Sequence, residues 1–102
     1  MERKLVPTSL NELMATTPTE VKGKNVDKEI LRTAMISELD AINLYEQFAE
    51  KTTNKKLKAL LLDIAKEEKT HFGEFQAFLL EIDKEQVAEL KAGQKEDRKS
   101  VV

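Results

Sequence analysis

Glu68 and His71 form a Glu-x-x-His motif in the second half of this 102-residue chain. On a helix, residues three apart lie on the same side, so this spacing presents a carboxylate and an imidazole together. The same spacing is typical of helical bundles that hold two irons through carboxylates. Oxygen and nitrogen donors without sulfur suit iron or manganese. Because the sequence has no cysteine, a thiolate zinc site, a rubredoxin-type iron centre and a cysteine nucleophile are excluded.

A second carboxylate, Glu38, interrupts the apolar stripe of an earlier helix. Glu68 and His71 interrupt the stripe of the following helix in the same way. If the turn between the helices is centred on Thr53, Glu38 and Glu68 lie equally far from it, and an antiparallel hairpin brings them level. The apolar residues of the first stripe are Leu31, Ala34, Met35, Ala41, Ile42, Tyr45, Phe48 and Ala49.

Two carboxylates at one height in an apolar seam repel each other, and burying either charge without a partner is costly. A divalent cation relieves both effects, so the sequence predicts a metal site formed by Glu38, Glu68 and His71. The alternative is that the true apolar stripe is shifted by one residue. The carboxylates then lie at a solvated edge, and His71 is a packed core histidine. Tyr45, two turns from Glu38 on the same face, is either a phenol near the metal or an ordinary core residue.

The predicted site is only half of a di-iron centre. Such a centre uses two helices with Glu-x-x-His and two helices that each supply one glutamate. This chain offers one helix of each kind, and a two-helix hairpin alone buries little apolar surface. The simplest completion is a two-fold dimer in which Glu38, Glu68 and His71 of both copies surround two metals.

The pattern of helix breakers places the elements that carry these residues. Both prolines fall in residues 1–24, which we interpret as a mobile N-terminal arm. Residues 25–92 are expected to form an all-α domain, an antiparallel hairpin of two helices plus a short third helix. The first helix begins at a cap on Asn25 or Asp27 and ends near Lys51. The second runs from about Lys55 to Ile82.

Residues 52–54, Thr-Thr-Asn, are expected to supply the turn and the helix-capping side chains between the two long helices. Asp83 is the candidate cap of the third helix, which is expected over residues 84–91. Residues 93–102 are expected to be a disordered tail or a linker. Gly73, inside the second helix, suggests a close approach by another backbone.

Composition excludes several classes of function. The chain has 19 acidic and 17 basic residues and a net charge of −2, which argues against nucleic acid as a partner. No stretch approaches the ~20 apolar residues of a membrane span. The first residues do not resemble a secretory signal, so a cytoplasmic location is expected.

The run ISELDAINLYEQ at residues 36–47, followed by EEKTH at residues 67–71, resembles the encapsulated ferritins of the ferritin-like superfamily. The resemblance covers about residues 27–92. It implies a hairpin that dimerises into a ferritin-like four-helix bundle, and dimers that assemble into a ring, a decamer in this family. Ser37 and Leu44 depart from the family pattern, which often has glutamate and tryptophan at these positions.

The resemblance also implies a function. Glu38, Glu68 and His71 match the ligands of a di-iron ferroxidase centre shared between two subunits, Tyr45 matches the tyrosine near the metals, and Asp40 matches an acidic residue on the metal-access route. Members oxidise Fe(II) with oxygen inside an encapsulin shell, which stores the iron mineral. Calcium at access or assembly sites is a further expectation.

Three other interpretations follow from the same features. Some archaeal relatives are fused to the shell protein, so the chain is a candidate N-terminal domain of such a fusion. A rubrerythrin-like di-iron peroxidase is an alternative enzyme, although that chemistry normally draws electrons through a cysteine-ligated iron. A non-catalytic helical oligomerisation module, which binds calcium or no metal, is the alternative outside enzymes.

Overall fold

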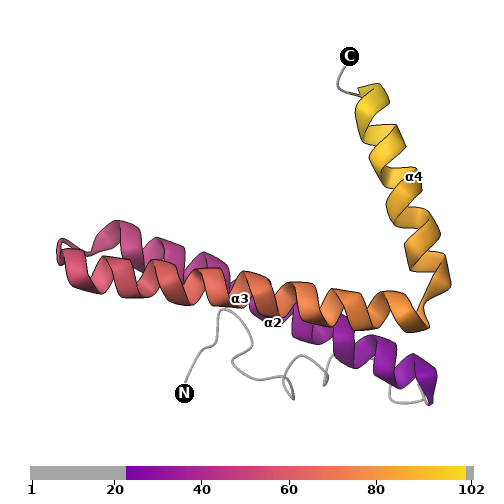
Figure 1. Ribbon diagram of the computed structural model, residues 1–102, viewed down its shortest axis with the longest axis horizontal. Coiled ribbons are helices and arrows are strands. Elements are labelled where there is room, and N and C mark those ends of the chain that lie inside the picture. Colours follow the sequence, from indigo (N-terminus) through magenta and orange to yellow (C-terminus); the bar gives the residue numbers. More distant parts are fainter. Residues whose placement is uncertain (1–22, 101–102) are drawn as a thin grey trace, which may run out of the picture.

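The structure, a computed structural model, describes residues 23–100. This part of the chain contains three helices and no strands: α2 (Lys24–Lys51), α3 (Lys55–Ile82) and α4 (Lys84–Ser100). Helices α2 and α3 form a long antiparallel hairpin, and α4 leaves its open end at a steep angle (Figure 1). The predicted all-α hairpin is confirmed. Most of the expected N-terminal arm, residues 1–22, lies outside the described residues.

The start of α2 differs from the prediction. The cap is Gly23 and neither Asn25 nor Asp27, and Gly23 provides no side-chain hydrogen bond. Its φ of 61° is a conformation that glycine adopts without steric cost. Its carbonyl accepts hydrogen bonds from the backbone N–H groups of Val26 and Asp27, at 3.0 and 3.3 Å. Asp27 therefore lies in the first turn, where its negative charge still favours the helix.

The turn between α2 and α3 follows the predicted capping chemistry. Asn54 caps α3 because its Oδ1 accepts a hydrogen bond of 2.9 Å from the backbone N–H of Leu57. The hydroxyl of Thr52 accepts a hydrogen bond of 3.1 Å from the backbone N–H of Asn54. The predicted bounds of α3 agree with the structure, since residues with strong turn and capping preferences stand at both of its ends.

Helix α4 corrects the sequence prediction. It continues past Lys91 and Gly93 to Ser100, so residues 93–100 are helical and the expectation of a disordered tail does not hold for them. One interior glycine costs a helix only ~1 kcal/mol. The surrounding lysine, glutamate, glutamine and alanine residues all favour helix.

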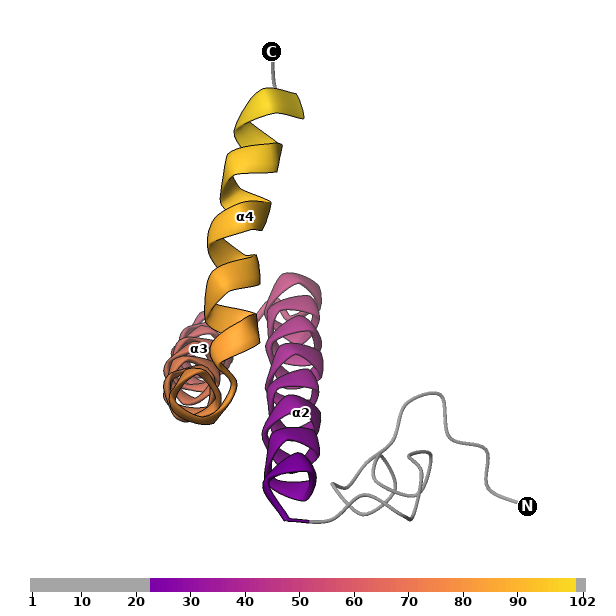
Figure 2. The ribbon, with the colours of Figure 1, turned by 90° about the vertical axis from the view of Figure 1, so that its right-hand side faces the viewer.

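The hairpin is held together by a narrow apolar seam between α2 and α3, which lie side by side when seen end on (Figure 2). Few apolar residues of the described chain are buried, and half of them are alanines: Leu31, Ala34, Ile42, Ala49, Ala65 and Leu79. Ten large apolar side chains of the described chain remain exposed, among them Leu44, Phe48, Leu60 and Phe78. No helix in the described range is both long enough and apolar enough to traverse a membrane.

Candidate metal centre

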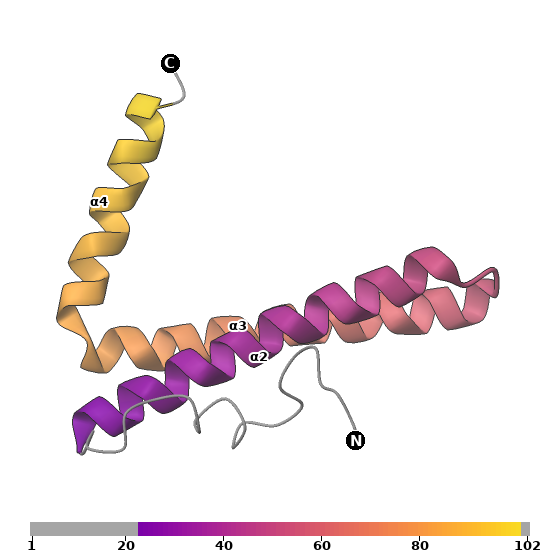
Figure 3. The same ribbon diagram turned by 180° about the vertical axis from the view of Figure 1, so that it is seen from behind.

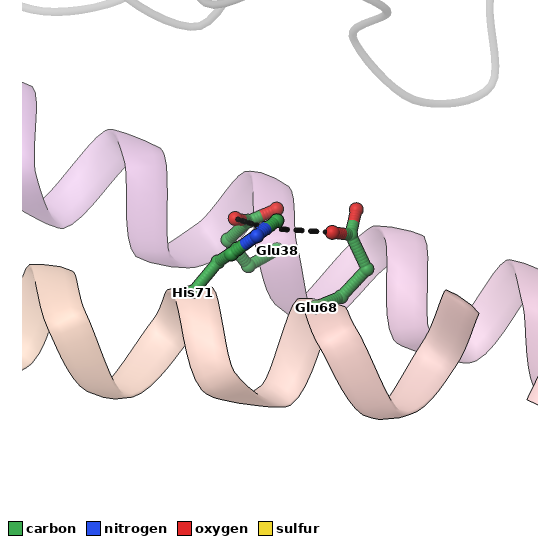
Figure 4. A group of neighbouring side chains, drawn as sticks. All are labelled: Glu38, Glu68 and His71. Atoms are coloured by element: carbon green, nitrogen blue, oxygen red, sulfur yellow. Dashed lines mark ion pairs between the residues drawn. The ribbon is translucent and has the colours of Figure 1, made fainter. Parts of the chain in front are cut away.

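Glu38 extends from α2 toward α3, where it meets Glu68 and His71 (Figure 4). The imidazole Nδ1 of His71 lies 2.8 Å from Oε1 of Glu68 and 3.2 Å from Oε2 of Glu38. One nitrogen of the histidine is thus shared by two carboxylates from different helices.

The seam leaves this group partly open to solvent. The side chains of Glu38 and Glu68 are 15% and 19% exposed, while His71 is 49% exposed. The two carboxylates therefore lie within the seam and the imidazole stands at its edge. Such an arrangement allows a small ion to reach the carboxylate oxygens from one side of the hairpin.

Burial raises the pKa of Glu38 above its ordinary value, and the negative charge of Glu68 raises it further. His71 acts in the opposite direction, because its positive charge and its hydrogen bond favour the ionised carboxylate. The pKa of Glu38 is therefore raised overall. Without a cation, the ionised form of Glu38 lowers the stability of the folded protein. A cation that contacts both carboxylates removes this cost.

The donor set fits a divalent first-row metal. One ligand atom from each of Glu38, Glu68 and His71 can be chosen so that all three lie within 4.8 Å of one another. Carboxylate oxygen and imidazole nitrogen are donors that iron and manganese accept. Nδ1 of His71 faces both carboxylate oxygens, so it can bind a metal there when it carries no proton.

The structure brings together three of the five residues singled out from the sequence. Tyr45 is half-buried on α2, two turns beyond Glu38, and it is not part of the carboxylate and imidazole group. Asp40, two residues after Glu38, is also half-buried and outside the group. Among the described residues, the three-residue cluster is the sole group of its kind.

Two ion pairs across the hairpin were not predicted. Lys69 Nζ lies 3.1 Å from Glu46 Oε2, and Arg32 Nη2 lies 2.9 Å from Asp83 Oδ2. The first pair joins exposed side chains beside the cluster, whereas the Asp83 carboxylate is nearly buried. No sequence signal reveals the second pair, because its residues are 51 positions apart and not level in the expected register.

Comparisons with known proteins identify the family of the chain. The sequence profile described as rubrerythrin matches residues 29–100. A ferritin-like-encapsulin shell fusion protein of Pyrococcus furiosus is 50% identical over 68 residues, which is 67% of this chain and 20% of that protein. The chain thus spans about a fifth of the length of the fusion protein.

A solved structure shows that the fold is also shared. The crystal structure of an encapsulated ferritin domain from P. furiosus has a TM-score of 0.78 and 46% sequence identity, and the match covers 91% of this chain and 94% of that one. The family profile spans most of the chain and the solved domain matches nearly all of it. The chain therefore belongs to the encapsulated ferritins, within the rubrerythrin family of ferritin-like proteins.

Proposed function

We propose that this chain is a ferroxidase, which oxidises Fe(II) to Fe(III) at a di-iron centre formed where two copies pair. The observation that carries the proposal is the cluster of Glu38, Glu68 and His71 within an otherwise apolar seam. Polar ligands at such positions are costly unless a cation uses them. In a ferritin-like chain, that cation is expected to be iron.

A single hairpin provides too few donors for two irons. Two Glu-x-x-His helices and two single-glutamate helices are needed, and each copy supplies one of each. Pairing about a two-fold axis doubles the cluster to four carboxylates and two imidazoles. Two Fe(II) ions give two electrons, which with two protons reduce one oxygen molecule to hydrogen peroxide. The role of this chain is to hold the ions in place through these carboxylates and imidazoles.

Exposed apolar side chains support pairing through the face that carries the cluster. Leu60 and Phe78 lie 11 and 7 residues from His71, close to whole numbers of helical turns, so all three share one side of α3. Leu60 is 55% exposed and Phe78 is 56% exposed. Large apolar groups on both sides of a ligand are expected at a surface that a second copy covers.

We further propose how the centre is used. Tyr45 is expected to lie near the metals in the dimer, and Asp40 on the route by which Fe(II) reaches them. Dimers are expected to assemble into a ring, which the family resemblance implies is a decamer, with calcium at access or assembly sites. The similar fusion protein supports an encapsulin shell as the partner, in a cytoplasmic nanocompartment that stores the iron mineral.

Substitution of the ligands tests the site. Glu38→Ala, Glu68→Ala and His71→Ala are each expected to abolish paired iron binding and oxygen-dependent ferric absorbance, while circular dichroism shows unchanged helix content. Glu46→Ala is the matched control, because Glu46 is also a glutamate of α2 but pairs with Lys69. Normal iron oxidation by all three ligand variants would refute the assignment.

Hydrogen peroxide in place of oxygen tests the peroxidase alternative, which predicts faster turnover with peroxide.

A further inference from the structure

The corner between α3 and α4 consists of the single residue Asp83, which is only 6% exposed. Its Oδ1 accepts a hydrogen bond of 3.0 Å from the backbone N–H of Gln86 and so caps α4. Its Oδ2 accepts a hydrogen bond of 2.9 Å from Nη2 of Arg32 on α2. Its backbone N–H donates to the carbonyl of Leu79 at the end of α3. One residue thus joins all three helices.

Among the described residues, few contacts join the rest of α4 to the hairpin. Beyond its first turns the helix extends away from the hairpin, as the front and back views show (Figures 1 and 3). Gln86 and Leu90 line a cavity of about 300 Å³ in the inner corner, together with Met35 and Leu39 of α2 and Leu80 of α3. Because this cavity is not filled by side chains, packing restrains the direction of α4 weakly.

The bonds of Asp83 restrain the same direction more strongly. A carboxylate that accepts from both a backbone N–H and a guanidinium makes charge-assisted hydrogen bonds, which are stronger and more directional than neutral ones. The guanidinium belongs to α2, whereas the capped N–H belongs to α4. Rotation of α4 about the corner must therefore break one of the two bonds or move the Arg32 side chain.

We propose that Asp83 and Arg32 form an elbow that fixes the direction of α4 relative to the hairpin, so that α4 is a rigid arm. At ~1.5 Å per residue, the 17 residues of α4 place the end of the arm ~25 Å from the corner. Most of the similar fusion protein lies outside the matched region, so a fixed arm would set how a hairpin of this kind is oriented toward an attached domain. The proposal does not depend on iron binding.

Distances between two spin labels test the elbow. The sequence has no cysteine, so Gln47→Cys on α2 and Lys95→Cys on α4 give two defined labelling positions, both exposed. Labelled chains are diluted with unlabelled protein so that the measured distance is within one chain. We expect one narrow distance distribution for the parent protein. A broad distribution for the parent protein would overturn the rigid arm.

Variants then test the two residues. Arg32→Met and Asp83→Ala are each expected to widen the distribution by about twofold or more, because α4 then rotates about a corner without its crossing bond. Lys69→Met, which removes the other ion pair across the hairpin, is the matched control and is expected to leave the distribution unchanged. Circular dichroism checks that the helices persist, and Asp83→Asn, which keeps a capping oxygen, replaces Asp83→Ala if helicity is lost. Unchanged distributions in folded variants of both positions would overturn the proposal.

Discussion

The effect of Glu38→Gln on stability should change sign when metal binds. Without metal, the Glu38 carboxylate lies in a seam beside Glu68, and both burial and the neighbouring charge raise its pKa. Glutamine keeps the size of the side chain, removes the charge and can donate a hydrogen bond to Glu68. With metal, the same substitution removes an anionic ligand. We therefore expect Glu38→Gln to stabilise the metal-free protein and to destabilise the metal-bound protein.

The magnitude follows from the separation of the charges. Two unit charges 4.8 Å apart, the upper limit for the ligand atoms of the cluster, repel by about 1 kcal/mol in water and by about 3 kcal/mol at an effective dielectric constant near 20. His71 offsets part of this repulsion, and the site is partly solvated. A net gain of about 1 kcal/mol is expected without metal, which raises the melting temperature of a domain of this size by roughly 5 °C.

The assay is thermal unfolding at pH 7 and one protein concentration, in chelator and then with excess Mn(II). Protonation removes the charge that destabilises the seam, so the gain without metal should be full above the raised pKa of Glu38 and should disappear as the pH falls through it toward the ordinary value. Glu46→Gln is the control, since its exposed partner Lys69 gives a small effect that is independent of metal. Destabilisation by Glu38→Gln in chelator, or the same shift with and without Mn(II), would refute the reasoning.

Three further predictions concern the scaffold. Asn54→Ala should lower the free energy of unfolding by about 1 kcal/mol in urea titrations, because it removes the cap of α3. Gly73→Ala should raise it by about 1 kcal/mol, since among the described residues an added Cβ meets no atom within 4 Å outside its own stretch of helix; a loss instead would indicate contact with another copy. The capping hydrogen bond from Gln86 and the ion pair with Arg32 lower the pKa of Asp83, so the stability that Asp83 adds should be present above its ordinary pKa and lost as the pH falls through the lowered one. Acid titration of the wild type against Asp83→Asn measures this difference, and an advantage that persists in strong acid would contradict it.

Periodicity and capping were sufficient to predict the hairpin. Long helices with few breakers and a polar turn leave little choice of architecture, and Asn54 and Asp83 act at the ends of α3 as expected. The cluster was predictable for a related reason. An ionisable residue inside an apolar stripe is conspicuous, and equal distance from the turn makes Glu38 and Glu68 meet.

Features that depend on tertiary geometry were not predictable. The Arg32–Asp83 pair requires the angle between α3 and α4, which no local pattern encodes. Helix α4 extends further than Gly93 suggests, because the helix-favouring residues around this glycine outweigh its cost. The space around Gly73 is open among the described residues, so the close approach of another backbone that this glycine suggested is not found there.

Anaerobic titration with Fe(II), followed by native mass spectrometry and then by admission of air, tests the central claim most directly. The proposal predicts that iron binds in pairs, two ions for each pair of chains, and that ferric absorbance then rises faster than in buffer alone. Glu68→Ala should show neither effect. Assembly without bound iron, together with oxidation no faster than in buffer, would contradict the claim that Glu38, Glu68 and His71 form half of a ferroxidase centre.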